Sequence, residues 1–264
     1  MLINKLIKLK NILKRPTLEY LETNIVDHGN LNCKACTHFC PVAKINFINI
    51  KSFNRDLNEI REKINIKIFR IMGGEPLLHP NICEFLYIAR KNFPKTDIRL
   101  VTNGLLLKKM PEHFWVALRL TNVKVDMSKY PPTNNEFDSY INLINENNVK
   151  VGDINDADKF FLSLNLKGDT DKRKFYNSCL SKRCKNLRNG RIMICPTACY
   201  VILYNDAFNK SIPHDRGIDI YSASGDEIIN YLKQIPDTCS YCSNREVFIE
   251  WDFSKREENE WVVK

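Results

Sequence analysis

Over roughly its first 166 residues, this 264-residue chain alternates between two hydrophobic periods. Segments whose apolar residues recur at helical spacing lie between short β-rich runs, and such an alternation is typical of parallel β/α units. The runs predict strands at 20–26, 66–72, 98–102, 123–127, 150–154 and 160–166. The helical segments are expected at 53–64, 80–93, 111–118 and 137–144.

The pattern changes near residue 167, where cysteine, glycine and proline begin to separate short segments. We therefore expect a core at 17–170 and a small cysteine-rich α+β domain at 171–264. A basic amphipathic helix is predicted at 1–16, because Leu and Ile alternate with lysines before Pro16 ends the pattern. This helix could pack on its own domain or lie on a membrane surface, and packing is the favoured alternative.

Composition narrows the class of protein. The formal net charge is +9, but the lysines are spread along the chain without a stripe of basic and aromatic residues, which does not favour nucleic-acid binding. The sequence has no apolar run long enough for a transmembrane helix and no signal-peptide core, so we expect a cytoplasmic protein. In such a setting ten cysteines indicate metal binding rather than disulfides.

Three of these cysteines, Cys33, Cys36 and Cys40, lie within eight residues, directly after the first predicted strand. Thiolates so close together repel one another unless a cation holds them, so the spacing predicts a soft metal centre. Zinc and iron–sulfur clusters both satisfy this spacing. In parallel sheets the functional loops follow the carboxyl ends of the strands, where Gly73-Gly74-Glu75-Pro76 and Asn103-Gly104 also fall.

These motifs resemble those of the radical S-adenosylmethionine (SAM) enzymes. The resemblance covers about residues 20–165 and rests on three segments: Asn30-Leu31-Asn32-Cys33-Lys34-Ala35-Cys36-Thr37-His38-Phe39, Gly73-Gly74-Glu75-Pro76 and Val101-Thr102-Asn103-Gly104. It implies an α/β fold, a partial (β/α)6 TIM-like barrel, with a [4Fe–4S] cluster held by three cysteines. The open iron of that cluster binds SAM, whose reductive cleavage yields a 5′-deoxyadenosyl radical that abstracts a substrate hydrogen.

The chain departs from the family at one ligand. The usual Cys-x3-Cys-x2-Cys spacing would place a cysteine at position 29, where this chain has Gly29, whereas Cys33 and Cys36 match the other two ligands. Cys40 could replace the missing ligand, which is the favoured interpretation. Alternatively, the site is degenerate and the protein is a non-catalytic iron–sulfur or zinc protein that acts through binding.

The same resemblance implies which residues contact SAM. Backbone groups of Gly73 and Gly74 are expected to reach its ammonium group, and Glu75 to brace the loop. Asn103 and Ser128 end later strands and could meet its ribose or carboxylate, although either could equally serve a turn.

The second half carries its own cysteine pattern. Asn189-Gly190 predicts a type I′ hairpin that pairs Arg188 with Arg191 and brings Cys184 opposite Cys195. Cys179, Gly190 and Cys195 resemble the opening of the SPASM and Twitch auxiliary-cluster domains, and Cys239 and Cys242 supply a later Cys-x2-Cys pair. An auxiliary iron–sulfur cluster would use four of Cys179, Cys184, Cys195, Cys199, Cys239 and Cys242; a structural zinc site is the alternative.

Together these features predict a radical SAM oxidoreductase that acts on a small sugar-like molecule or a peptide. We expect it to receive electrons from a donor such as flavodoxin or ferredoxin.

Overall fold

The computed structural model describes residues 15–244 and 247–264. The helix predicted at 1–16 therefore lies, up to residue 14, outside the described residues. Within the described ranges no helix is long and apolar enough to cross a lipid bilayer.

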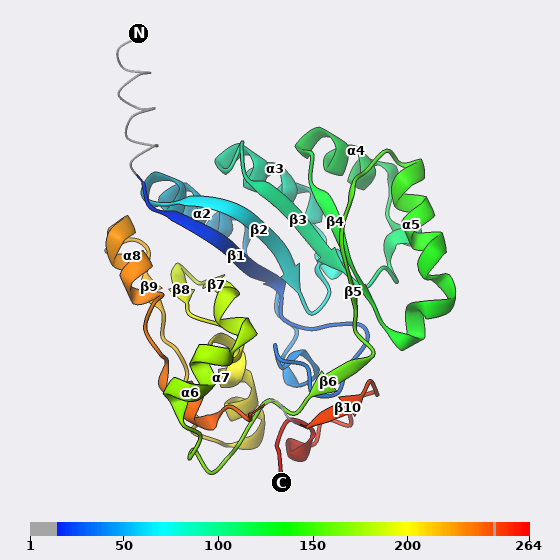
Figure 1. Ribbon diagram of the computed structural model, residues 1–264. Coiled ribbons are helices and arrows are strands. Elements are labelled where there is room, and N and C mark those ends of the chain that lie inside the picture. Colours follow the sequence, from blue (N-terminus) through cyan, green and yellow to red (C-terminus); the bar gives the residue numbers. More distant parts are fainter. Residues whose placement is uncertain (1–14, 245–246) are drawn as a thin grey trace.

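An eight-stranded sheet in the order β5-β4-β3-β2-β1-β7-β8-β9 forms the body of the protein (Figure 1). Strands β1 to β5 are parallel to their neighbours, and β7 is parallel to β1. The predicted α/β fold with a parallel sheet is thus confirmed. The strands span Thr17–Val26 (β1), Asn65–Gly73 (β2), Asp97–Thr102 (β3), Lys124–Lys129 (β4), Val151–Asp156 (β5), Lys185–Arg188 (β7), Arg191–Met193 (β8) and Ile218–Asp219 (β9).

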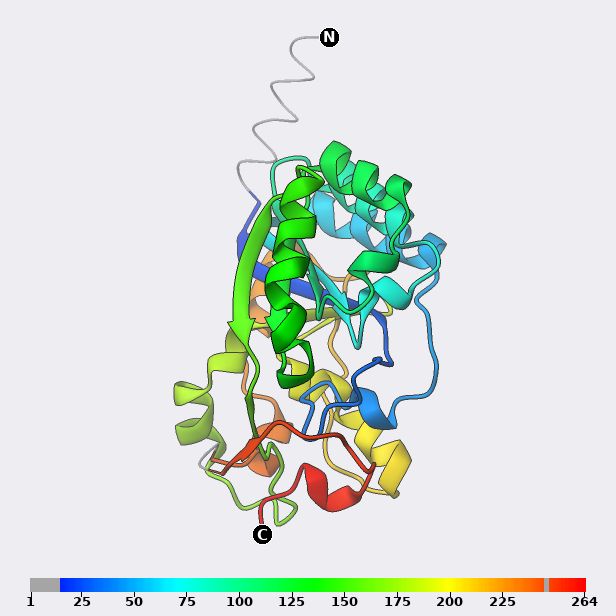
Figure 2. The same cartoon turned by 90° about the vertical axis from the view of Figure 1, so that its right-hand side faces the viewer.

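Four helices connect the first five strands and cover one face of the sheet (Figures 1 and 2). They are α2 (Ile50–Lys63), α3 (Ile82–Asn92), α4 (Glu112–Thr121) and α5 (Phe137–Glu146). Leu21 and Phe69 point from the strands into the apolar layer formed with these helices. Because side chains alternate along a strand, their neighbours Glu22 and Arg70 point to the opposite, concave face.

The run predicted as a strand at 160–166 does not join the parallel sheet. Its first part forms β6 (Lys159–Phe161), which pairs antiparallel with β10 (Phe248–Glu250) in a separate two-stranded sheet. Strand β5 is consequently the edge of the large sheet, and four of its six residues, from Asp153 to Asp156, are exposed.

The cysteine-rich half is continuous with the main sheet through the β7–β8 hairpin. Its register pairs Leu187 with Ile192 and Arg188 with Arg191, as the sequence predicted. Asn189 and Gly190 have φ values of 50° and 71°, and two positive φ angles are the requirement of a type I′ turn. The remaining helices of this half are α6 (Lys172–Ser178), α7 (Pro196–Phe208) and α8 (Gly225–Tyr231).

Candidate metal and cofactor site

A cavity of about 630 Å³ opens at the carboxyl ends of β1 to β4. The parallel strands bring together at this edge the eight residues that the sequence singled out in the first half of the chain. They are Cys33, Cys36, Cys40, Gly73, Gly74, Glu75, Asn103 and Ser128, and all of them line the cavity. Their functions as ligands or cofactor contacts are still predictions.

Close packing of two chain segments explains the glycine pair after β2. A Cβ atom on Gly73 would lie 2.4 Å from the carbonyl oxygen of Val26, and one on Gly74 would lie 2.2 Å from the carbonyl of His28. Any larger residue would therefore push the β2 loop away from the β1 loop. The glycines keep backbone groups, rather than side chains, at the wall of the cavity.

Glu75 braces this edge of the sheet from within. Its carboxylate accepts hydrogen bonds from the Thr102 hydroxyl at 2.8 Å, the Asn103 backbone N–H at 3.0 Å and the Leu77 backbone N–H at 3.0 Å. Burial raises the pKa of Glu75 to about 7, against the lowering effect of these donors. Asn103 in turn donates its side-chain amide to Asn30 Oδ1 at 2.7 Å, which joins the β3 loop to the cysteine loop.

The cysteine loop folds so that its backbone surrounds Cys36. Asn32, Ala35 and Phe39 adopt positive φ angles of 52°, 56° and 54°, which turn the chain sharply around the thiol. The Cys40 thiol and the backbone N–H groups of residues 38–40 hydrogen-bond to the Cys36 sulfur and lower its pKa to about 7, although burial opposes this. A thiolate is the form that binds a metal, so Cys36 is prepared for ligation.

Tyr130 lies close to all three thiols of the cysteine loop. Burial and the nearby Cys33, Cys36 and Cys40 raise the pKa of this phenol well above its usual value, while a hydrogen bond to Ser128 opposes the shift. Tyr130 lines the same cavity. The sequence analysis missed it, although it lies two residues after Ser128 at the end of a predicted strand.

The C-terminal tail holds the outer side of the cysteine loop. Trp261 is fully buried and donates its indole N–H to the Cys36 carbonyl at 2.8 Å. Asn32 donates its side-chain amide to the Ser254 carbonyl at 2.6 Å, and Lys34 N–H donates to the Asp252 carbonyl at 2.9 Å. Strand pattern and motif spacing could not reveal these contacts, because the tail follows the loop by more than 200 residues.

The chemistry of the donors fits an iron–sulfur cluster. Three thiols share one cavity wall, and thiolates are the usual cluster ligands. Within residues 15–244 and 247–264, no group of three His, Cys, Asp or Glu side chains is arranged around a single-ion position. The support for an iron–sulfur cluster therefore comes from the three thiol donors and from the cavity beside them. Cys33, whose pKa is raised to about 12 by burial and by Cys36, would need the cluster's positive charge to ionise.

Four of the six remaining candidate cysteines lie around one position in the second half. Cys179, Cys239 and Cys242 form one buried cluster with Phe175, and burial together with the nearby Cys239 and Cys179 raises the pKa of Cys195 to about 12. The pKa of Tyr176 rises through burial and the nearby Cys195, Cys239 and Cys179. The structure therefore groups Cys179, Cys195, Cys239 and Cys242.

Cys184 and Cys199 lie outside this group of four cysteines. Burial and then Glu22 raise the pKa of Cys184, which places that thiol toward the concave face of β1. Burial also raises the pKa of Cys199, against the lowering effect of Arg188. The paired register of the hairpin ends at Asn186 and Met193, so it does not extend to Cys184 and Cys195. Cys179 packs with Cys239 and Cys242 in one buried cluster, which does not include Cys184, although Cys184 lies near Cys195.

Known proteins resemble this chain over part of its sequence and in its fold. No family model matches the chain. It is 34% identical over 118 residues to the GTP 3′,8-cyclase of Trichodesmium erythraeum, a match that covers 42% of this chain and 35% of that protein. The GTP 3′,8-cyclase of Thermodesulfovibrio yellowstonii is also 34% identical over 118 residues, and 41% of this chain and 35% of that protein are covered. The chain thus spans about a third of the length of these curated relatives.

One solved structure is similar over nearly the whole chain. BtrN, in complex with AdoMet and 2-DOIA, aligns with a TM-score of 0.53 at 18% identity, covering 94% of this chain and 100% of BtrN. At that identity the likeness shows the fold. The partial sequence matches support the resemblance of the motifs around the cavity to those of the radical SAM enzymes.

Proposed function

We propose that the protein is a radical SAM enzyme that holds a [4Fe–4S] cluster through Cys33, Cys36 and Cys40 and binds SAM in the adjoining cavity. One observation carries this proposal: the three thiols line the same cavity as Gly73 and Gly74, whose backbones are packed too closely for any side chain. When bound, such a cluster supplies the electron for reductive cleavage of SAM.

Different residues of this chain would have different roles around the cluster. Cys36, already stabilised as a thiolate, and Cys33 and Cys40 would bind iron. The half-buried backbone at Gly73 and Gly74, which lines the cavity, could accept hydrogen bonds from an ammonium group, while Asn103 and Ser128 would face the rest of the cofactor. Glu75 would fix the positions of the β2 and β3 loops through its three hydrogen bonds.

Anaerobic reconstitution with iron and sulfide tests the proposal. The protein is expected to gain the absorption and electron paramagnetic resonance of a [4Fe–4S] cluster and, with dithionite and SAM, to release 5′-deoxyadenosine. A cluster without SAM cleavage, or no cluster at the three cysteines, would favour the alternative of a non-catalytic binding protein. Gly29 in place of the family's first cysteine is the feature that keeps that alternative open.

The second cysteine group supports an auxiliary cluster of the SPASM or Twitch kind. Cys179, Cys195, Cys239 and Cys242 would be its ligands, and a structural zinc ion is the competing occupant. Lys185 lies beside these thiols with its ammonium bound to the carbonyls of Ile194 and Leu232 at 3.1 and 3.2 Å. A fixed positive charge there would balance the negative charge of a thiolate-bound cluster.

The reaction proposed is an oxidation of a small sugar-like or peptide substrate. An auxiliary cluster could accept the electron left on the substrate after hydrogen abstraction, or hold the substrate directly. A flavodoxin or ferredoxin would supply the reducing electron. The printed names of the relatives do not decide among these substrates for this chain.

A further inference from the structure

The C-terminal tail places a buried hydrogen-bond donor beside the cysteine loop. This donor is the indole Nε1 of Trp251, which is buried and makes no hydrogen bond of normal length and angle to any residue that the structure describes. A buried N–H that lacks an acceptor loses its hydration without compensation, so such groups are rare in folded proteins. The Trp251 donor therefore calls for an acceptor.

The backbone around Trp251 is fixed against the cysteine loop. The Lys34 N–H donates to the Asp252 carbonyl at 2.9 Å, and Cys33 forms an antiparallel bridge with Phe253. The Trp251 ring also packs edge-on against Phe253, with ring centroids 4.8 Å apart. These contacts hold the indole close to the Cys33 side chain.

The sulfur of Cys33 is the acceptor beside this indole. Burial and the neighbouring Cys36 raise the pKa of the Cys33 thiol to about 12, whereas the Trp251 N–H favours the thiolate and opposes that shift. A neutral thiol is only a weak acceptor, so it leaves the donor without a full hydrogen bond. An iron-bound thiolate carries negative charge and would accept a stronger one.

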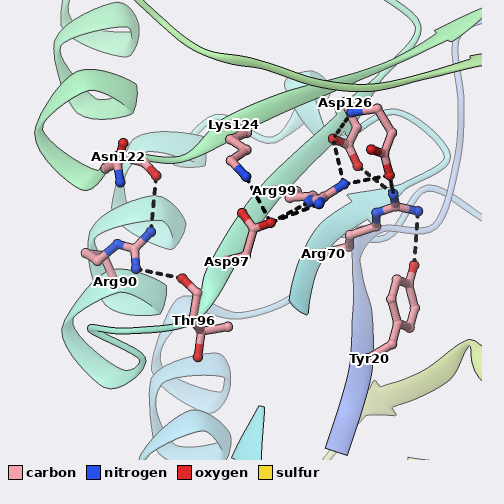
Figure 3. Close-up of polar contacts among 10 residues, drawn as sticks. Tyr20, Arg70, Arg90, Thr96, Asp97, Arg99, Asn122, Lys124 and Asp126 are labelled. Atoms are coloured by element: carbon pink, nitrogen blue, oxygen red, sulfur yellow. Dashed lines mark hydrogen bonds and ion pairs between the residues drawn. The ribbon is translucent and has the colours of Figure 1, made fainter. Parts of the chain in front are cut away.

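Positive side chains around the cavity are paired or exposed. On the concave face of the sheet, Arg70 ion-pairs with Asp126 at 2.8 Å (Figure 3). Lys44 and Arg256 line the cavity, but both are exposed, so water and salt screen their charges. A buried donor in contact with a ligand sulfur is screened much less. Trp251 is thus well placed to act on the charge of a cluster at this loop.

We propose that the Trp251 indole donates a hydrogen bond to the Cys33 thiolate of the iron–sulfur cluster and thereby raises the reduction potential of that cluster. The inference rests on the proposed function for the presence of the cluster, but the potential that it predicts does not depend on SAM cleavage. Hydrogen bonds to the sulfurs are among the factors that set the potential of such clusters. Reduction adds negative charge to the sulfurs, so a donor stabilises the reduced form more than the oxidised form.

A redox titration of the reconstituted full-length protein, followed by electron paramagnetic resonance, tests this role. The signal of the loop cluster is identified by its absence from Cys36→Ser, because a second cluster is proposed for the other cysteine group. Trp251→Phe removes the indole N–H and keeps an aromatic ring. It should lower the equilibrium constant for one-electron reduction about tenfold, which corresponds to about 59 mV, while the iron content stays that of the wild type.

A second replacement separates the donor from the packing of the ring. Benzothienylalanine at position 251 has sulfur in place of the indole N–H and nearly the same shape as tryptophan. It should lower the potential as Trp251→Phe does. This replacement also provides the measurement if Trp251→Phe fails to hold a cluster.

Phe253→Leu is the matched control. Phe253 is the exposed ring that contacts Trp251, and its side chain carries no hydrogen-bond donor. Its variant alters the packing of the tail and should leave the potential unchanged. An unchanged potential after loss of the indole N–H, or an equal shift in Phe253→Leu, would overturn the inference while SAM cleavage continues. The expected shift without 5′-deoxyadenosine formation would support the inference and count against the proposed function alone. A wild type without a cluster at these cysteines would overturn both.

Discussion

Gly29 faces Gly74 across the mouth of the cavity: a Cβ atom placed on Gly29 would lie 3.4 Å from the Gly74 carbonyl carbon. That distance is ordinary van der Waals contact, and Gly29 is not among the glycines with positive φ. The position that carries the first ligand in the family can therefore accept a cysteine without rebuilding the loop.

We predict that Gly29→Cys binds a cluster at least as stable as that of the wild type. The added thiol would stand beside Cys33 and Cys36 in the same cavity, which lowers the cost of gathering three ligands. Iron content and the rate of cluster loss to a chelator measure the effect. Gly74→Ala is the matched control, since its Cβ would lie 2.2 Å from the His28 backbone and should displace the loop. If Gly29→Cys takes up iron and the wild type takes up none at this loop, the native site is degenerate.

Cys40 provides the second prediction, because its thiol hydrogen-bonds the Cys36 sulfur in the described structure. Replacing Cys40 with Ser should abolish SAM cleavage if Cys40 is the substitute ligand, although it lies off the family's spacing. The readout is 5′-deoxyadenosine released per protein under reducing conditions. Cys83→Ser is the control, since Cys83 lies on α3 and bonds only weakly, at 3.9 Å, to the His113 carbonyl. Wild-type turnover in the Cys40 variant would show that two cysteines suffice or that another group binds the third iron.

The parallel sheet and the loops at its carboxyl edge could be predicted because each depends on local pattern. Strand β2 was expected at 66–72 and spans Asn65–Gly73, and helix α3 was expected at 80–93 and spans Ile82–Asn92. Once the strands are parallel, Gly73 and Asn103 must meet at one edge. The resemblance to the radical SAM enzymes rests on these same motifs.

What the sequence did not reveal depends on contacts between distant segments. The run at 160–166 has strand character, but whether it extends the sheet or pairs with residues 248–250 is decided by tertiary packing. The hydrogen bond from Trp261 to the Cys36 carbonyl joins positions that are 225 residues apart in the sequence. The parallel pairing of β7 with β1 joins the two halves of the chain, and no local signal specifies that pairing.

Glu22 gives a prediction for pH. Burial raises its pKa to about 7 in the folded protein, against lowering effects of Tyr20, Arg70 and Asn186, whereas its ordinary pKa is 4.5. The folded state therefore keeps a proton that the unfolded state releases, and this stabilisation is complete below about pH 4.5 and is lost as pH rises through 7. The groups that face Glu22 are Tyr20 on its own strand, Arg70 on β2, Asn186 on β7, Cys184, His38 on the cysteine loop and Tyr200 on α7.

Denaturant unfolding at pH 5 and pH 8 measures this dependence. The free energy of unfolding of wild type relative to Glu22→Gln should fall by up to roughly 3 kcal/mol between these pH values, since one pKa unit corresponds to about 1.4 kcal/mol. Both proteins must be compared in the same cluster state. An equal difference at both pH values would mean that Glu22 is already ionised in the fold at pH 5.

The cysteine group in the second half yields the last prediction, which separates ligands from neighbours. Cys179→Ser and the double variant Cys239→Ser with Cys242→Ser should each lower the iron content by one cluster. Cys184→Ser should leave it unchanged, because Cys184 lies outside the buried cluster of Cys179, Cys239 and Cys242. The four grouped cysteines are spread over more than sixty residues and are joined only by short elements, so ligation would be coupled to the folding of this region. Losing the cluster should therefore expose the segments around these cysteines, 172–184 and 233–242, to proteolysis while strands β1 to β5 stay intact. Iron, sulfide and zinc analysis of the wild type and the three variants shows which metal this region binds and which cysteines hold it. Zinc in the wild type would assign the group to a structural site, and iron loss in Cys184→Ser without loss in Cys179→Ser would restore the pairing across the hairpin.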